Sequence, residues 1–142
     1  MIDRARPIAL LLARVAIGAV FFVHGWMKLT QMGLGMTTQF FEGSGVPLAM
    51  IAAPAITFLE IIGGVAFILG AALPVFGVLL ALDMVGAMFF VHFANGFTVD
   101  KGGYEFVLAL GAGALAVAFS RGGAFALDDL WHRRRQSATT NA

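Results

Sequence analysis

The residues best suited to chemistry are polar side chains placed at the ends of long apolar segments. His24 and Lys28 end the first apolar segment, and their spacing of four residues puts them on one face of a helix. His92, Asn95 and Glu105 lie in the most polar interval between the two ends of the chain, residues 91–105. Imidazole, ammonium, amide and carboxylate groups donate or accept hydrogen bonds, and several of them exchange protons. These residues therefore predict a polar binding site.

Three further charged residues, Arg14, Glu60 and Asp83, lie inside apolar segments. A single charge at the centre of a lipid bilayer costs ~2.5–3.5 kcal/mol on insertion scales, so such residues face the protein interior and compensate one another. We expect an Arg14–Glu60 contact, with Asp83 either as a second partner or protonated. A second interpretation is that Glu60 and Asp83 relay protons.

The composition points to lipid as the solvent of this chain. Of its 142 residues, 60% are hydrophobic and 12% are charged, against roughly 25% charged in ordinary soluble proteins. Four apolar segments lie at about residues 8–26, 48–69, 75–94 and 104–119. A transmembrane helix has to cross about 30 Å of hydrocarbon. The sequence therefore predicts an all-α membrane protein whose residues 1–123 form a four-helix transmembrane bundle.

Basic residues at the two ends predict the orientation. Arg4 and Arg6 precede the first apolar segment, and Arg133–Arg135 lie in a predicted tail, residues 124–142, that begins with a short amphipathic interfacial helix. The positive-inside rule then predicts a multi-pass protein of the inner (plasma) membrane with cytoplasmic N- and C-termini. The net charge of +1 gives no reason to expect nucleic acid as a partner. The absence of cysteine excludes redox chemistry by the chain's own thiols.

This orientation brings five polar side chains from three segments into one outer layer: His24, Lys28, His92, Asn95 and Glu105. A quinone-like ligand fits such a layer, since its carbonyl groups need donors and its ring needs apolar walls, which Trp26 and Phe97 supply. Two alternatives remain open. His24, His92 and Glu105 could hold a metal ion or a haem, or the whole layer is a structural cap.

Small residues predict where the helices approach one another. Gly63 and Gly64 favour close packing of the second apolar segment. A second seam of small residues is predicted on one face of the fourth segment: Ala109, Gly113 and Ala116. Residues 28–46 are predicted to be a loop that contains a short interfacial helix over 36–42.

Four groups of residues follow the pattern of a known family. They are Arg14 with His24-Gly25 and Lys28; Glu60 with Gly63-Gly64; His92 with Asn95-Gly96-Phe97, Gly103 and Glu105; and Phe125-Ala126-Leu127-Asp128. Together they resemble the DoxX family of four-span membrane proteins over nearly the whole chain. The resemblance implies an inner-membrane protein linked to respiratory or sulfur redox chemistry. It also implies soluble partners, because mycobacterial relatives are linked to a complex with a superoxide dismutase and a sulfurtransferase.

The function expected from these observations is that of a small membrane subunit in a respiratory or thiol/sulfur-linked redox system. If the protein takes part in catalysis, we expect a quinone-linked oxidoreductase subunit rather than a stand-alone enzyme. A non-catalytic anchor that recruits soluble oxidative-stress enzymes is the alternative, and a small-solute or proton transporter is the third. A homo-oligomer is compatible with each of these.

Overall fold

The computed structural model describes residues 2–120 and 123–129, and every regular element in these two ranges is a helix. In chain order the elements are α1 (Ile2–Met27), η1 (Lys28–Met32), α2 (Gly33–Gly43), α3 (Ala49–Leu69), α4 (Leu73–Ala87), η2 (Met88–His92), η3 (Phe93–Asn95), η4 (Val99–Lys101) and α5 (Glu105–Ala118). The turns η1 and η2 are π-helical, and η3 and η4 are 3₁₀-helical. The predicted all-α class is confirmed.

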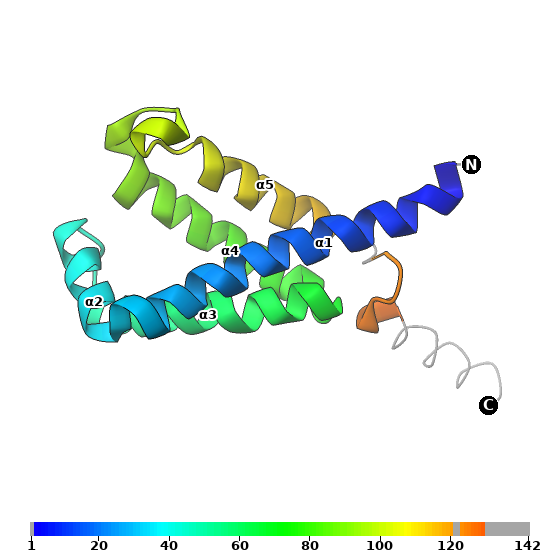
Figure 1. Ribbon diagram of the computed structural model, residues 1–142, viewed down its shortest axis with the longest axis horizontal. Helices are drawn as coiled ribbons and strands as arrows, with labels where there is room; N and C mark the ends of the chain where they lie inside the picture. The colour runs from blue at the N-terminus through cyan, green and yellow to red at the C-terminus, as the bar shows by residue number, and fades with distance from the viewer. Residues whose placement is uncertain (1, 121–122, 130–142) are drawn as a thin grey trace.

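The first tightly packed pair consists of α1 and α3, which run side by side in opposite directions (Figure 1). A Cβ atom added to Gly18 of α1 would lie 2.6 Å from the carbonyl oxygen of Gly64. One added to Gly64 would lie equally close to the backbone nitrogen of Phe22. Only glycine permits this approach, so the predicted packing role of Gly64 is confirmed. Gly63 faces Leu80 of α4 instead.

The second pair consists of α4 and α5. Gly77 of α4 abuts Ala118, and Gly111 of α5 lies against Met84. The predicted seam on the fourth apolar segment is wrong in its phase, because Ala109 and Ala116 are exposed. The helix instead buries a neighbouring face: Val107, Gly111, Ala114, Val117 and Ala118. Small residues recur on both faces of α5, so the pattern alone does not select the buried one.

One apolar core joins the two pairs, with Phe21, Phe67, Leu80 and Met84 among its buried members. Three helical stretches are long and apolar enough to cross a membrane: Ala5–Gly43, Ala49–Leu69 and Leu73–Asn95. The helix α5 is apolar but shorter, at 14 residues. Many large apolar side chains on the outside of these helices are exposed, as expected for contact with lipid.

The predicted loop at residues 28–46 is wrong for most of its length. The chain stays helical from Lys28 to Gly43, first as η1 and then as α2. Gly33 separates the two with a φ of 74°, which is the left-handed region that favours glycine. The short helix predicted over 36–42 therefore exists, as part of α2, and its Phe41 packs against Ala49 and Ala53 of α3.

Both ends of the described chain lie at the same end of the molecule, away from α2 and the turns that precede α5 (Figure 1). We call this the terminal end and the opposite one the loop end. The backbone nitrogen of Ala124 donates to the carbonyl oxygen of Pro7 at 3.0 Å, which holds residues 123–129 against α1. Residues 127–129 form one helical turn, and the rest of the predicted tail helix, with Arg133–Arg135, lies outside the described residues.

Candidate functional site

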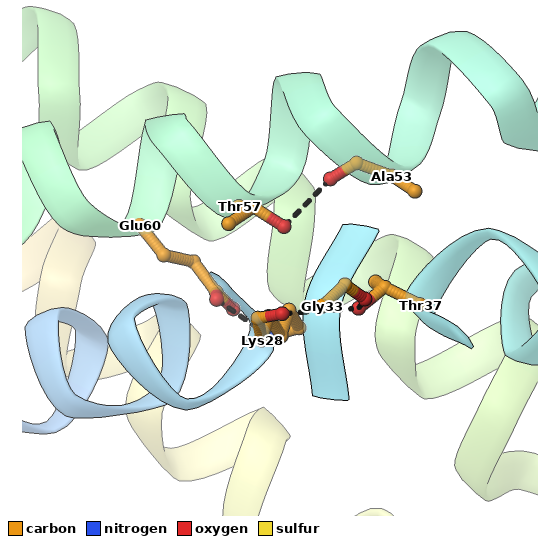
Figure 2. Close-up of polar contacts among 6 residues, drawn as sticks. All are labelled: Lys28, Gly33, Thr37, Ala53, Thr57 and Glu60. Carbon is orange, nitrogen blue, oxygen red and sulfur yellow. Dashed lines mark hydrogen bonds and ion pairs between the residues drawn. The ribbon is translucent and has the colours of Figure 1, made fainter. Parts of the chain in front are cut away.

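The most buried ion pair of the described chain joins η1 to α3. Lys28 Nζ lies 2.5 Å from Glu60 Oε2, and the side chains are 20% and 4% exposed. Figure 2 shows Glu60 directed from α3 toward Lys28, with Thr57 one turn along α3 and with Thr37 and Gly33 beyond Lys28. The hydroxyl groups of Thr57 and Thr37 are occupied locally, since they donate to the carbonyl oxygens of Ala53 and Gly33. The lysine is therefore the polar partner of the buried carboxylate.

Helix register explains why these two residues meet. Gly18 lies against Gly64, and a Cβ on Gly25 would lie 2.8 Å from the carbonyl oxygen of Thr57 and 2.9 Å from the Glu60 Cβ. The carboxylate thus starts beside Gly25 and reaches one turn further to Lys28. Because Gly25 has no side chain, nothing on α1 stands between the two charged groups.

Asp83 of α4 completes a cluster of three ionisable groups, which we call the Lys28–Glu60–Asp83 cluster. Its carboxylate lies close enough to Glu60 and Lys28 to act on both electrostatically. Its Oδ2 atom is buried and has no hydrogen-bond partner in the described structure. Three helical elements, η1, α3 and α4, therefore each bring one charged side chain to the same place.

One π-helical turn begins at the cluster, and a second follows Asp83 on the same helix. Lys28 begins η1, and η2 begins at Met88, five residues after Asp83 on the same continuous helical stretch. A π-helical turn holds one residue more than an α-helical turn and is frequent at functional sites. Within η1 the Thr30 hydroxyl donates to the carbonyl oxygen of Trp26 at 2.8 Å, so a side chain satisfies this backbone acceptor.

The predicted Arg14–Glu60 contact is wrong. The same register that places Glu60 near Gly25 places Arg14 beside Gly70, at the other end of α3. Arg14 and Gly25 are eleven residues apart on α1, and a helix rises by ~1.5 Å per residue. The resulting separation along the helix axis is longer than an arginine side chain. The predicted charge network of Arg14, Glu60 and Asp83 is therefore split between two places, and Lys28 takes the role expected of Arg14.

Arg14 instead holds the terminal end together. It is 1% exposed, and its Nη2 donates to the carbonyl oxygen of Ala124 at 2.8 Å. Asp128 and Asp129 act on its charge. The carboxylate of Asp128 also accepts from the backbone nitrogens of Ala72 (2.8 Å) and Leu73 (2.9 Å). A side chain from a distant segment thereby caps the first turn of α4.

The loop residues of the predicted outer layer bind their own loop. His92 Nδ1 and Asn95 Nδ2 both donate to the carbonyl oxygen of Gly102, at 2.7 and 3.3 Å. Glu105 Oε1 accepts from the backbone nitrogen of Val99 at 2.6 Å. In this structure these three side chains therefore order the turns between α4 and α5.

The remaining candidates lie on the outside. His24 is exposed, and its ring centroid is 6.3 Å from that of Phe106 on α5. Trp26 is half exposed and stacks on Phe22, while Phe97 packs edge-on against Tyr104. His24, His92 and Glu105 do not converge as a metal-binding set, and the described residues contain no group of three His, Asp or Glu side chains arranged to hold a metal ion.

A hollow of about 200 Å³ opens between α4 and α5. It is lined by Ala81, Met84, Val85, Met88, Val107, Leu108, Gly111, Ala112 and Leu115. None of the predicted ligand-binding residues is among them. The hollow offers an apolar surface and no hydrogen-bonding side chain.

The Lys28–Glu60–Asp83 cluster is the part of the described structure best equipped for chemistry. Its ammonium group can donate to a carbonyl oxygen, and its carboxyl groups can accept or exchange a proton. Lys28 and Asp83 are each partly exposed, whereas Glu60 is buried, and His24 lies one turn before Lys28 on α1. Surrounding helices and lipid strengthen each electrostatic interaction by lowering the local dielectric.

Two features of the sequence could have revealed this arrangement. Gly18 and Gly25 are seven residues apart, and so are Thr57 and Gly64. In an antiparallel pairing, Gly18 can meet Gly64 while Gly25 meets Thr57. This pairing places Glu60 next to Gly25 and far from Arg14. The cap from Asp128 has a weaker signal: residues 70–74, Gly-Ala-Ala-Leu-Pro, offer no side-chain acceptor for the start of α4.

Comparison with known proteins links this geometry to a family. The family model described as DoxX matches residues 9–93, more than half of the chain. The protein named "Putative oxidoreductase CatD" of Bacillus subtilis (strain 168) is 34% identical over 99% of both chains. Two proteins of Escherichia coli (strain K12) are also similar. "Inner membrane protein YqjF" is 30% identical over 92% of this chain and 98% of its own, and "Inner membrane protein YphA" is 28% identical over 87% and 91%. No solved structure matches the chain significantly.

Proposed function

Because the chain belongs to the DoxX family of membrane proteins, we propose that it is a small integral-membrane subunit of a redox system. Its role is to bind a quinone-like ligand at the Lys28–Glu60–Asp83 cluster. The name of the Bacillus subtilis relative, "Putative oxidoreductase CatD", supports the redox assignment. The chain contains no cysteine, so its own thiols cannot supply the electrons, and we assign that role to a partner enzyme.

The observation that carries this proposal is the buried Lys28–Glu60 ion pair with Asp83 beside it. Reduction of a quinone to a quinol takes two electrons and two protons. A site for such a ligand therefore needs a donor for the quinone carbonyl and groups that exchange protons. The Lys28 ammonium is the donor, the carboxyl groups exchange protons, and the exposed His24 forms the rim.

The proposal includes a membrane topology. The three long helices and α5 form four spans in the inner membrane, with both termini in the cytoplasm. The contact between Ala124 and Pro7 supports this, since it puts both ends of the described chain at one end of the bundle. The names of the two Escherichia coli relatives support the inner membrane. The loop end then faces outward, and the cluster lies inside the bundle below it.

A second candidate function is that of an anchor for soluble redox enzymes such as a superoxide dismutase or a sulfurtransferase. The observation that favours it is the fixed start of the tail, which Arg14 and Asp128 bind to the bundle. A partner that binds residues 130–142 would be attached to a segment whose start, residues 123–129, is bound to the bundle. Deletion of these residues removes partner capture in this account and leaves ligand binding unchanged.

Extraction of the protein in native lipid particles, followed by mass analysis of the bound lipids, tests the leading proposal. Wild-type protein should retain quinone at a level well above that in bulk lipid. The Glu60→Gln variant should lose this enrichment, and Glu42→Gln, which changes an exposed carboxylate of α2, should keep it. Equal quinone content in wild type, Glu60→Gln and bulk lipid would rule the site out.

A further inference from the structure

We propose that Glu60 and Asp83 hold one exchangeable proton between them, balanced by the single positive charge of Lys28. The inference deepens the proposed function. It rests on that function only for what the proton does, which is to pass to the bound ligand. The proton site itself can be measured without any ligand, so the two proposals fail separately.

The charges of the cluster favour one bound proton. The cluster contains two carboxyl groups and one ammonium group, drawn from α3, α4 and η1. With every group ionised the cluster would carry a net charge of −1, inside a bundle whose outside is apolar. With one carboxyl protonated the cluster is neutral. A low-dielectric surrounding favours the neutral arrangement, because an uncompensated charge there has neither water nor a partner.

Hydrogen bonding also favours this proton, independently of the charges. Asp83 Oδ2 is buried and finds no donor in the described structure. An ionised carboxylate accepts hydrogen bonds only, whereas a protonated one also donates. Its neighbour is Glu60, another carboxyl group. A proton between the two supplies the missing donor, because one carboxyl then donates to the other while Lys28 holds the Oε2 atom of Glu60.

The surroundings leave the proton as the best occupant. Lys28 already stands 2.5 Å from Glu60 Oε2, in the position that a bound cation would need. The other described basic groups of the bundle are placed elsewhere: Arg14 lies at the terminal end, and His92 binds the carbonyl oxygen of Gly102. His24 is exposed and lies beside Phe106. When the proton leaves for a ligand oxygen, the cluster takes up the net charge of −1. A proton from the loop end restores it.

Infrared spectroscopy of the reconstituted protein at neutral pH tests the proposal. Wild type should show the C=O stretch of one protonated carboxyl group, shifted when H₂O is exchanged for D₂O. Asp83→Asn and Glu60→Gln should each abolish this band, because the remaining carboxylate forms a simple ion pair with Lys28. Both variants keep charge balance, so both are expected to fold. Glu42→Gln, on exposed α2, is the matched control and should keep the band.

Lys28→Met gives the opposite prediction. Without the ammonium group both carboxyl groups hold a proton, so the band should roughly double. Absence of a protonated carboxyl band in wild type, or its persistence in either Asp83→Asn or Glu60→Gln, would overturn the proposal. If the band behaves as expected while no quinone binds, the proton site stands and the assigned ligand is wrong.

Discussion

A Cβ atom on Gly25 of α1 would lie 2.9 Å from the Cβ of Glu60 on α3. This approach sets the position of the buried charge. It starts the Glu60 side chain against bare backbone and lets its carboxylate reach Lys28 on the next turn. The glycine is thus part of the site although it contributes no functional group.

The ion pair between Lys28 and Glu60 should be strongly coupled. Removing one partner of a buried pair costs about 3–5 kcal/mol when the other charge is left uncompensated, and here Asp83 can compensate Lys28, so we expect a cost below that range. Lys28→Met and Glu60→Gln should therefore each destabilise the protein, and the double variant should be more stable than the sum of the two effects predicts. Equilibrium unfolding in detergent or bicelles measures this cycle, and strictly additive effects would show that the pair contributes no coupling.

Gly25→Ala should separate α1 from α3. A methyl group has no room there, and overpacking typically costs about 1–3 kcal/mol. Gly86→Ala is the matched control, because no atom beyond its own local helix lies within 4 Å of the position that its Cβ would take. Thermal unfolding of the two variants under identical conditions should lower the melting temperature for position 25 only. Equal melting temperatures would contradict the packing described for Gly25.

Asp128→Ala should loosen the terminal end. It leaves the backbone N–H groups of Ala72 and Leu73 without the acceptor seen here, and loss of a helix cap costs about 0.5–2 kcal/mol. Hydrogen exchange should then accelerate in the first turn of α4. Asp100→Ala, in the exposed η4 turn, should leave that turn unchanged. Unaltered exchange at Ala72 and Leu73 in Asp128→Ala would mean that the cap is dispensable.

Introduced cysteines can test the topology because the chain has none of its own. Asp100→Cys and Ser44→Cys, at the loop end, should react with an impermeant maleimide added outside intact cells. Ala5→Cys and Leu127→Cys, at the terminal end, should react only after the membrane is opened. Labelling of positions 5 and 127 from opposite sides would contradict the four-span topology.

The sequence was sufficient for the class of fold and for the positions of the apolar helices, because apolar length and charge depletion are read directly from composition. It also singled out Lys28, Glu60 and Asp83, although it assigned them to different groups. It did not reveal their partners: Arg14 was the more obvious cation for Glu60, and only the register set by Gly18, Gly25 and Gly64 favours Lys28. The prediction of a loop beginning at Lys28 was wrong because the chain continues as η1 and then as α2, with only Gly33 between them changing its direction.

The outer layer illustrates a second limit. His92, Asn95 and Glu105 were grouped with His24 and Lys28 by depth alone. Depth places residues in one plane but does not say which way their side chains face. In the structure the three loop residues bind Gly102 and Val99, a role that depends on the path of the turns between α4 and α5.

The central claim is that the Lys28–Glu60–Asp83 cluster is the working site of the protein. The most direct measurement is the affinity of the protein in lipid nanodiscs for a short-chain quinone, compared between wild type and Asp83→Asn, with Glu42→Gln as the control. We expect saturable binding by wild type and the control, and an affinity at least about tenfold lower, or 1.4 kcal/mol, for Asp83→Asn. Equal affinity in all three proteins, or no saturable binding by wild type, would contradict it.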